Sequence, residues 1–138
     1  MNSSKGARRL LYKYETKEGT ITIYKSVIGK IILEATGQFG GKVLLSNYKG
    51  KTSGFVTKIG GVDDSNFMEI SIGEDGLDLR FYIVIRFGTS INRVTEMLIA
   101  RIKKNTDEIT GLKVNSIVVV VTGIVSKQMV RRYIEVRG

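Results

Sequence analysis

The sequence predicts an α+β fold: a mixed, mostly antiparallel sheet with two main helices packed on one face, plus a short C-terminal helix. Apolar and polar residues alternate on both sides of the segment 74–76, and apolar residues recur at helical spacing between Ile91 and Ile109. The expected order is strand, helix, short strands, strand, strand, helix, strand. All 138 residues are expected to form one domain.

The clearest predicted segment is a hairpin between Phe67 and Phe87. Apolar and polar residues alternate up to Gly73, and the alternation resumes after Gly76. Such alternation is typical of strands, and Asp-Gly between two alternating runs is typical of a tight turn. The apolar set of the second strand is Leu77, Leu79, Phe81, Ile83, Ile85 and Phe87. The face that carries this set should be buried.

A helix is expected to follow this hairpin over residues 91–109. Ser90 is the expected N-cap, and Gly111 suits the left-handed position that closes a helix. The apolar stripe expected to face the sheet is Ile91, Val94, Leu98, Ile102 and Ile109. The next run, from Val114 to Val125, is apolar on both faces and should be a central strand. Strand, helix and strand in one sheet imply a parallel crossover.

The first half of the chain shows a smaller strand-helix pattern. Thr20 to Tyr24 alternates as a short strand, and Ser26 is the expected cap of a helix from Val27 to about Thr36. Around these elements we expect a basic N-terminal arm (1–18), a Gly/Lys-rich insertion (37–64) and a basic C-terminal tail (126–138) that forms the short helix. Two short strands are expected inside the insertion, at 43–45 and 55–59.

The net charge of +9 is unevenly distributed along the chain. Residues 1–61 carry +8 and residues 91–138 carry +5, whereas residues 62–90 carry −4. This distribution favours acidic partners, such as nucleic acid, anionic lipid headgroups or an acidic protein. The candidate anionic-partner surface consists of Lys42, Lys49, Lys51, Lys58, Lys103, Lys104, Arg131 and Arg132. The alternative interpretation is that these charges only maintain solubility.

The composition excludes several classes of catalytic site. Because the chain has no Cys and no His, it has no thiolate nucleophile, no Cys/His zinc site and no Ser-His-Asp triad. The segment 50–52 (Gly-Lys-Thr) lacks the earlier glycine and the following helix of a phosphate-binding loop. The clustered acids, which could hold a metal through oxygen ligands, are interpreted as turn and outer-strand positions. We therefore expect no enzymatic activity, no cofactor and no metal.

The cellular location of the protein is predicted from the segments that its sequence lacks. No apolar run reaches the roughly 18 residues that span a bilayer. The basic N-terminal region has only a short apolar cluster at 10–12, which is too short for a signal peptide. The lack of Cys agrees with a reducing compartment. We expect a cytoplasmic protein.

A family resemblance rests on the segment 81–88, the turn Thr110-Gly111-Leu112 and the valine-rich strand from Val114. This unit resembles the alkaline shock protein family of Gram-positive bacteria, in which an aromatic-Gly strand end, an amphipathic helix and a Thr-Gly-Leu turn precede an alternating valine strand. Residues 19–23 and 27–31 are similar to the family's opening strand and helix. The resemblance covers about residues 19–36 and 67–125. The longer, basic segment 37–64 departs from the family pattern.

The resemblance implies a non-enzymatic cytoplasmic accessory or scaffold protein linked to cell-envelope stress or lipid homeostasis. It implies action through self-association or through a membrane-anchored protein partner, which would also bring the chain to the membrane. It supplies no catalytic residues. The alternative is a nucleic-acid-binding module, in which the basic loop and tail contact phosphates and Phe39, Tyr48 and Phe55 stack on bases. An anionic membrane surface is a further candidate partner, and no small-molecule substrate is expected.

Overall fold

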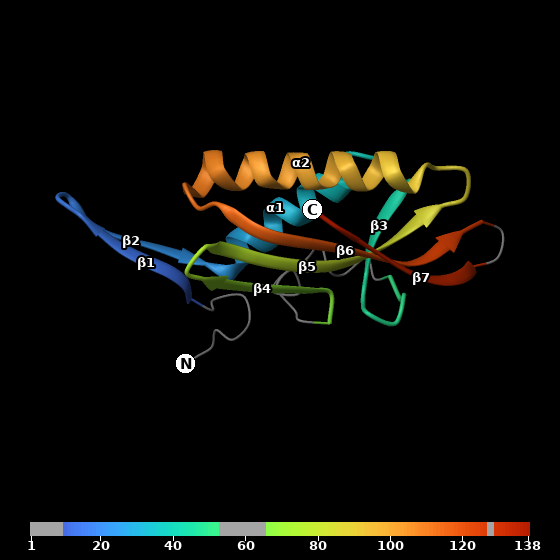
Figure 1. Ribbon diagram of the computed structural model, residues 1–138, viewed down its shortest axis with the longest axis horizontal. Coiled ribbons are helices and arrows are strands. Elements are labelled where there is room, and N and C mark those ends of the chain that lie inside the picture. The colour runs from blue at the N-terminus through green and yellow to red at the C-terminus, as the bar shows by residue number, and fades with distance from the viewer. Residues whose placement is uncertain (1–9, 53–65, 127–128) are drawn as a thin grey trace.

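The computed structural model describes residues 10–52, 66–126 and 129–138, and the side chains of residues 129–133 lie outside that description. The elements in chain order are β1 (Leu10–Thr16), β2 (Gly19–Tyr24), α1 (Lys25–Gly37), β3 (Val43–Ser46), β4 (Met68–Gly73), β5 (Gly76–Arg86), α2 (Ile91–Thr110), β6 (Val114–Val125) and β7 (Met129–Arg137). The α+β class, with mixed sheet pairing and two helices, is confirmed. Both helices lie on one side of the larger sheet (Figure 1).

Strand β5 organises the five-stranded sheet. Along one edge it pairs antiparallel with β4 near its start and with β3 near its end. Along the other edge it pairs in parallel with β6, which in turn pairs antiparallel with β7. The apolar strand β6 therefore lies between two other strands, as its sequence predicts. The β5–α2–β6 unit is the expected parallel crossover connection.

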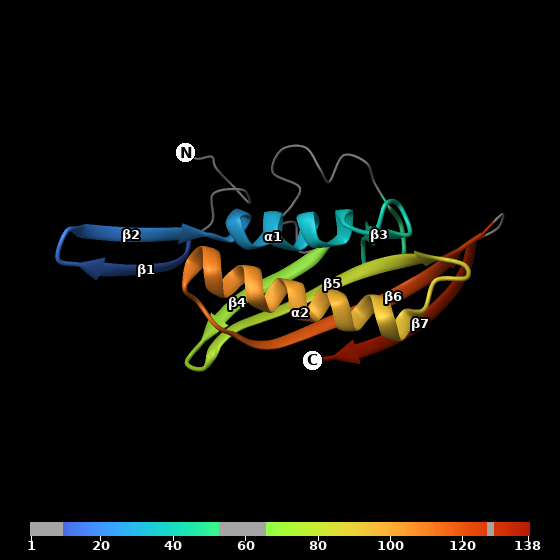
Figure 2. The same cartoon turned by 90° about the horizontal axis from the view of Figure 1, so that it is seen from above.

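The core lies between this sheet and the two helices, which run side by side over it (Figure 2). The apolar set of β5 from Leu77 to Ile85 is buried, as predicted, whereas Phe87 lies beyond the strand and is 74% exposed. In α2 the stripe Val94, Leu98 and Ile102 is buried. The expectation for Ile109 is wrong, because the last turns of α2 place Thr106 against the core and leave Ile109 exposed.

The two helices begin in different ways. The Ser90 side chain accepts a hydrogen bond from the Arg93 backbone N–H at 3.2 Å, and Gly111 has φ +77°, so both predicted ends of α2 are confirmed. Helix α1 instead follows β2 directly, with Tyr24 in the N-cap position and no side-chain cap. The prediction that Ser26 caps α1 is wrong, because Ser26 already lies inside the helix.

Two strands were not expected from the sequence. The predicted C-terminal helix is wrong: the tail forms β7, whose residues from Met129 to Arg137 pair with β6. The N-terminal arm contributes β1, which pairs with β2 as a separate two-stranded sheet. Within the insertion, the short strand at 43–45 is confirmed as β3. The strand expected at 55–59 lies outside the described residues.

Gly76 permits a close approach between the β4–β5 hairpin and the start of β6. Its φ is +127°, and a Cβ built at this position would lie 2.5 Å from the Lys113 carbonyl oxygen. The same oxygen accepts a hydrogen bond from the Leu77 backbone N–H at 2.8 Å. Glycine is therefore needed at this position both for its backbone angle and for its lack of a side chain.

Candidate functional site

The five-stranded sheet has two faces of different chemistry. Side chains directed toward α1 and α2 are apolar, whereas those on the opposite side, the helix-distal face, are mixed. The residues that the strand registers place on the helix-distal face include Glu69, Ser71, Asp78, Arg80, Tyr82, Ser116, Val118, Val120, Glu135 and Arg137. This follows from alternation, because successive side chains of a strand point to opposite faces.

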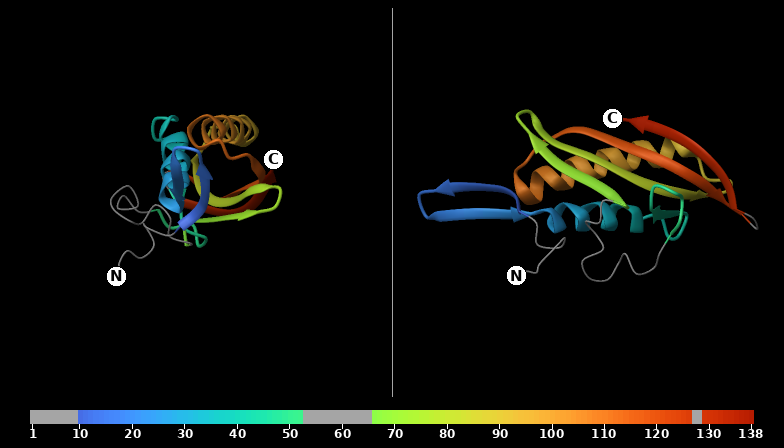
Figure 3. Two further views of the ribbon diagram at one scale, coloured as in Figure 1. Left: turned by 90° about the vertical axis from the view of Figure 1, so that its left-hand side faces the viewer. Right: turned by 90° about the horizontal axis from the view of Figure 1, so that it is seen from below.

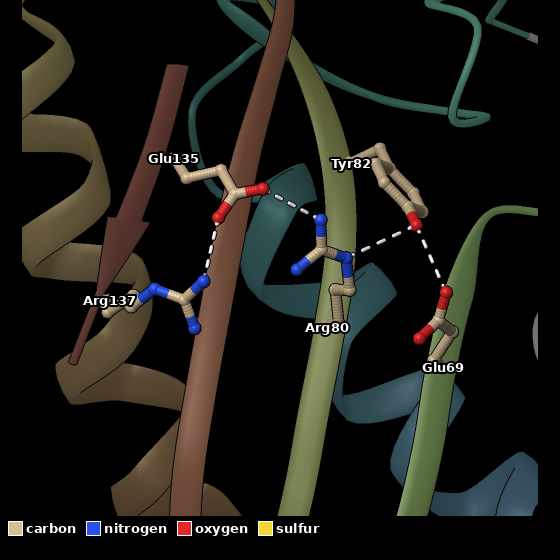
Figure 4. Close-up of polar contacts among 5 residues, drawn as sticks. All are labelled: Glu69, Arg80, Tyr82, Glu135 and Arg137. Carbon is tan, nitrogen blue, oxygen red and sulfur yellow. Dashed lines mark hydrogen bonds and ion pairs between the residues drawn. The ribbon is translucent and has the colours of Figure 1, made fainter. Parts of the chain in front are cut away.

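Five of these side chains form a continuous polar chain across the sheet (Figure 4). The Tyr82 hydroxyl donates to Glu69 on β4 at 3.1 Å, and the Arg80 Nε lies 3.4 Å from the same hydroxyl oxygen. Arg80 Nη2 forms an ion pair with Glu135 on β7 at 2.8 Å. Glu135 also pairs with Arg137 Nη2 at 2.9 Å. This polar chain therefore links β4, β5 and β7 above the valines of β6.

The ionisation of the polar chain follows from its contacts. Hydrogen bonding to Tyr82 and to Glu135 raises the pKa of Arg80 above its ordinary value, which holds the guanidinium in its charged form. Burial, together with the nearby Glu69 charge, raises the pKa of Tyr82, which favours its neutral hydroxyl. The guanidinium carbon also lies 5.8 Å from the centre of the Tyr82 ring. The tyrosine and the carboxylates thus position one fixed positive charge.

A second polar cluster lies beside this chain. Asp78 accepts hydrogen bonds from Ser116 Oγ at 2.7 Å and from Asn115 Nδ2 at 2.9 Å. These bonds, led by that from Ser116, lower the pKa of Asp78. Asp78, Ser116 and Arg80 line a hollow of about 150 Å³, together with other side chains of β4, β5 and β6. The helix-distal face therefore offers charges and hydroxyl groups of defined position.

The arrangement is suited to recognition by charge and hydrogen bonding. Arg80 and Glu135 each retain 26% side-chain exposure, and Arg137 retains 69%. A partner can therefore reach the polar chain from solvent. In the parts of the chain that the structure describes, no three acidic side chains converge as a metal-binding group.

The residues of the predicted anionic-partner surface lie in several places. Lys42 precedes β3, and Lys49 and Lys51 lie in the turn after it; all three are exposed. Lys103 and Lys104 are exposed on α2. Lys58 lies outside the described residues. Arg131 and Arg132 belong to β7, but their side chains are not described.

These residues do not form one continuous surface among the described side chains. The turn after β3 hangs on the side of the sheet opposite α2, so Lys49 and Lys51 are separated from Lys103 and Lys104 (Figure 1). The turn itself is ordered by Asn47, whose side-chain oxygen accepts from the backbone N–H groups of Lys49 and Lys51 at 2.9 and 2.8 Å. The Lys49 ammonium lies 5.7 Å from the Tyr48 ring centre. The described basic residues therefore form separate patches.

Sequence reasoning did not identify the polar chain. The alternation of the hairpin already places Arg80 and Tyr82 together on its polar side, and that signal was available. No such signal existed for Glu135, because the tail was predicted as a helix. The contact of Glu135 with Arg80 depends on the pairing of β7 with β6. A site assembled from three strands becomes visible only when all three are paired.

Comparison with known proteins identifies the family. The model of the alkaline shock protein 23 family, described as having a cell envelope-related function, matches residues 13–126. The chain belongs to this alkaline shock protein family. It is the family that the strand-helix-strand unit resembles. The match spans β2 through β6 and most of β1, and it ends one residue after β6.

A relative of this alkaline shock family protein is the uncharacterized protein YqhY of Bacillus subtilis (strain 168). The two are 26% identical over 111 residues, which cover 80% of each chain. No solved structure matches. Neither described helix combines the length and the apolar character that crossing a membrane requires.

Proposed function

We propose that this alkaline shock family protein is a non-enzymatic accessory or scaffold protein of the cytoplasm that serves the cell envelope by associating with another protein. The family description supports the envelope role, because it names a cell envelope-related function and no reaction. Envelope stress and lipid homeostasis are the processes we propose for it. The binding surface that we assign to the partner is the helix-distal face.

The observation that carries this assignment is the polar chain. A salt bridge on a surface contributes only about 0–1 kcal/mol to stability, so five linked polar side chains are a weak device for holding a sheet together. Arg80 is nevertheless held on both sides, by Tyr82 and by Glu135. Positioned charges of this kind confer specificity in protein–protein contacts. The partner segment should carry a carboxylate for Arg80 and Arg137, together with hydroxyl or amide groups for the hollow beside Asp78.

The test is affinity capture from the native host with three forms of the chain, followed by mass spectrometry. The forms are the natural sequence, an Arg80→Gln/Arg137→Gln variant and a Lys103→Gln/Lys104→Gln control. The control also removes two positive charges, but from α2 rather than from the helix-distal face. We expect an envelope protein to be enriched by the natural sequence and the control, and to be reduced at least tenfold by the Arg80→Gln/Arg137→Gln variant.

Two results would overturn the proposal. Equal enrichment by all three forms would show that the helix-distal face is not the contact surface. Turnover of a metabolite by the purified chain, abolished by a point substitution that leaves the melting curve unchanged, would show that the protein is an enzyme. Gel filtration of the three forms separates self-association from binding to a different protein.

Nucleic acid is the second candidate partner, and the turn after β3 favours it. Tyr48 is 50% exposed there, and Lys49 and Lys51 are exposed beside it. Exposed aromatic rings next to lysines are typical of single-strand binding surfaces. Filter binding at two salt concentrations tests this, because each phosphate contact adds about 0.7 to the log slope on a single strand. Absence of binding at low salt would remove this candidate.

A further inference from the structure

The β1–β2 hairpin is an arm that projects beyond the end of the five-stranded sheet. Figures 1 and 2 show the arm leaving the body of the molecule, with β2 running in line into α1. The view from below shows the same projection (Figure 3, right). Only Leu11 and Ile23 of the two strands are buried, and they anchor the base of the arm in the core.

The arm exposes apolar side chains on both of its faces. Tyr14 pairs with Ile21 and Tyr12 pairs with Ile23, which places these residues on one face. Leu10 pairs with Tyr24, whose side chain points to the other face because it directly follows Ile23. The exposed fractions are 53% for Leu10, 37% for Tyr12, 40% for Ile21 and 40% for Tyr24. A two-stranded hairpin is only marginally stable in water, so exposed apolar groups on it call for a partner.

The net charge of the chain indicates the kind of partner. Lys13 and Lys17 are exposed on the hairpin, and Glu15 and Glu18 balance them, so the hairpin itself is neutral. The whole chain, however, carries +9, and a second copy would bring the same charge. Repulsion between like charges therefore opposes association of two copies, whereas an anionic surface attracts the molecule.

The thin shape of the arm favours a lipid surface over a flat protein partner. A flat partner covers one face of a thin arm and leaves the other exposed, whereas the headgroup layer of a bilayer is fluid and surrounds both. Tyrosine side chains are enriched at membrane interfaces, because the ring contacts the acyl boundary and the hydroxyl stays hydrated. Lysine side chains at the same depth contact anionic headgroups.

We infer that the β1–β2 arm is a lipid-surface anchor, which inserts Leu10, Tyr12, Ile21 and Tyr24 into the headgroup layer of an anionic bilayer while Lys13 and Lys17 contact lipid phosphates. The anchor is separate from the helix-distal face, so it places the molecule at the membrane and leaves the polar chain for a protein partner. It does not depend on the function proposed for that face.

The first experiment is sedimentation with vesicles made of equal parts phosphatidylglycerol and phosphatidylcholine, compared with pure phosphatidylcholine. The full chain should sediment with the anionic vesicles and less with the neutral ones. The Tyr12→Ser/Ile21→Ser variant should lose at least tenfold in partitioning, and Lys13→Gln/Lys17→Gln should lose roughly fivefold for each charge removed. Met97→Ser removes an exposed apolar side chain from α2 and should bind like the natural sequence. Melting curves establish that each variant is folded.

The second experiment uses the absence of tryptophan from the chain. A Tyr12→Trp variant reports on the arm alone, and its emission should shift to the blue on addition of anionic vesicles. A Tyr48→Trp variant reports on the turn after β3 and should not shift.

Three outcomes would overturn the inference. They are equal or absent sedimentation with both vesicle types, an unchanged emission of Tyr12→Trp, and unaltered binding by Tyr12→Ser/Ile21→Ser. A gel-filtration dimer that becomes a monomer in Tyr12→Ser/Ile21→Ser, without vesicle binding, would assign the arm to a second copy instead.

Discussion

The five-stranded sheet and the β1–β2 arm are built from the same alternating pattern but are stabilised in different ways. In the sheet, Leu77, Phe81 and Ile83 of β5 are completely buried beneath two helices, as are Val119 and Val121 of β6. In the arm, only Leu11 and Ile23 are buried and Tyr14 packs partly against the core, whereas the other apolar side chains are exposed. The difference teaches that alternation alone specifies a strand, whereas packing decides whether its apolar face stabilises the fold or remains available for binding.

The strongest test of this comparison is a large-to-small substitution in each region. Phe81→Ala removes a completely buried ring between the sheet and the helices and should destabilise the fold by about 3–5 kcal/mol. Ile21→Ala removes a 40% exposed side chain from the arm and should cost less than about 1 kcal/mol. Denaturant unfolding of both variants measures the difference. Similar losses would mean that the arm belongs to the cooperative core.

The two hairpin turns give the next largest effect. Gly76→Ala combines a left-handed backbone angle with a collision against the Lys113 carbonyl, and it should cost about 1–3 kcal/mol. Gly19→Ala in the arm has φ +152° and meets nothing within 4 Å. It should therefore cost backbone strain without a collision, and it should lower the melting temperature less than Gly76→Ala does. An equal effect of the two substitutions would show that the approach of β6 to Gly76 does not limit stability.

The starts of the two helices refine the comparison further. Helix α2 begins from a loop and has a side-chain cap, so Ser90→Ala should destabilise the protein by about 1 kcal/mol. Helix α1 begins directly from the arm without such a cap, so Ser26→Ala should have almost no effect. Thermal unfolding of the pair measures this. A larger loss for Ser26→Ala would indicate that the start of α1 rearranges in solution.

The smallest expected effect concerns alkaline pH and the polar chain. The folded state raises the pKa of Tyr82 above its unfolded value of about 10. The contribution of Tyr82 to the stability of the fold is therefore fully present below its unfolded pKa. This contribution is lost as the pH rises through the pKa of Tyr82 in the folded protein. Tyr82→Phe should lose less stability than the natural sequence over this alkaline range. Parallel unfolding curves above about pH 10 provide the measurement. An identical alkaline loss in both proteins would contradict the role of burial and Glu69 at this tyrosine.

Several elements followed directly from local patterns. The period-two runs of β4 and β5 and the helical spacing of Val94, Leu98 and Ile102 identified the hairpin and α2. Ser90 and Gly111 marked the ends of α2, because capping depends on residues within one turn of the helix. The same unit carried the resemblance to the family. Each of these features is encoded in residues close together along the chain.

Other features depended on residues far apart in the sequence. The segment 129–137 has a local pattern compatible with a short helix, but its ladder with β6 makes it a strand. The β1 strand likewise forms because β2 folds back beside it. Neither β1 nor β7 needs a long apolar run in its own sequence to become a strand. Long-range hydrogen bonding overrides a weak local preference, since a strand is stable only beside another strand.

The sequence alone predicted the α+β class, the central hairpin-helix-strand unit and the uneven positive charge, because periodicity and composition are local properties. Its motifs also carried the resemblance to the family, which the family model then showed. The tertiary structure alone placed Arg80 between Tyr82 and Glu135, separated the described basic residues into different patches and left the arm projecting beyond the core. Such juxtapositions arise from the order in which strands pair. That order is decided by the free energy of the whole packed molecule.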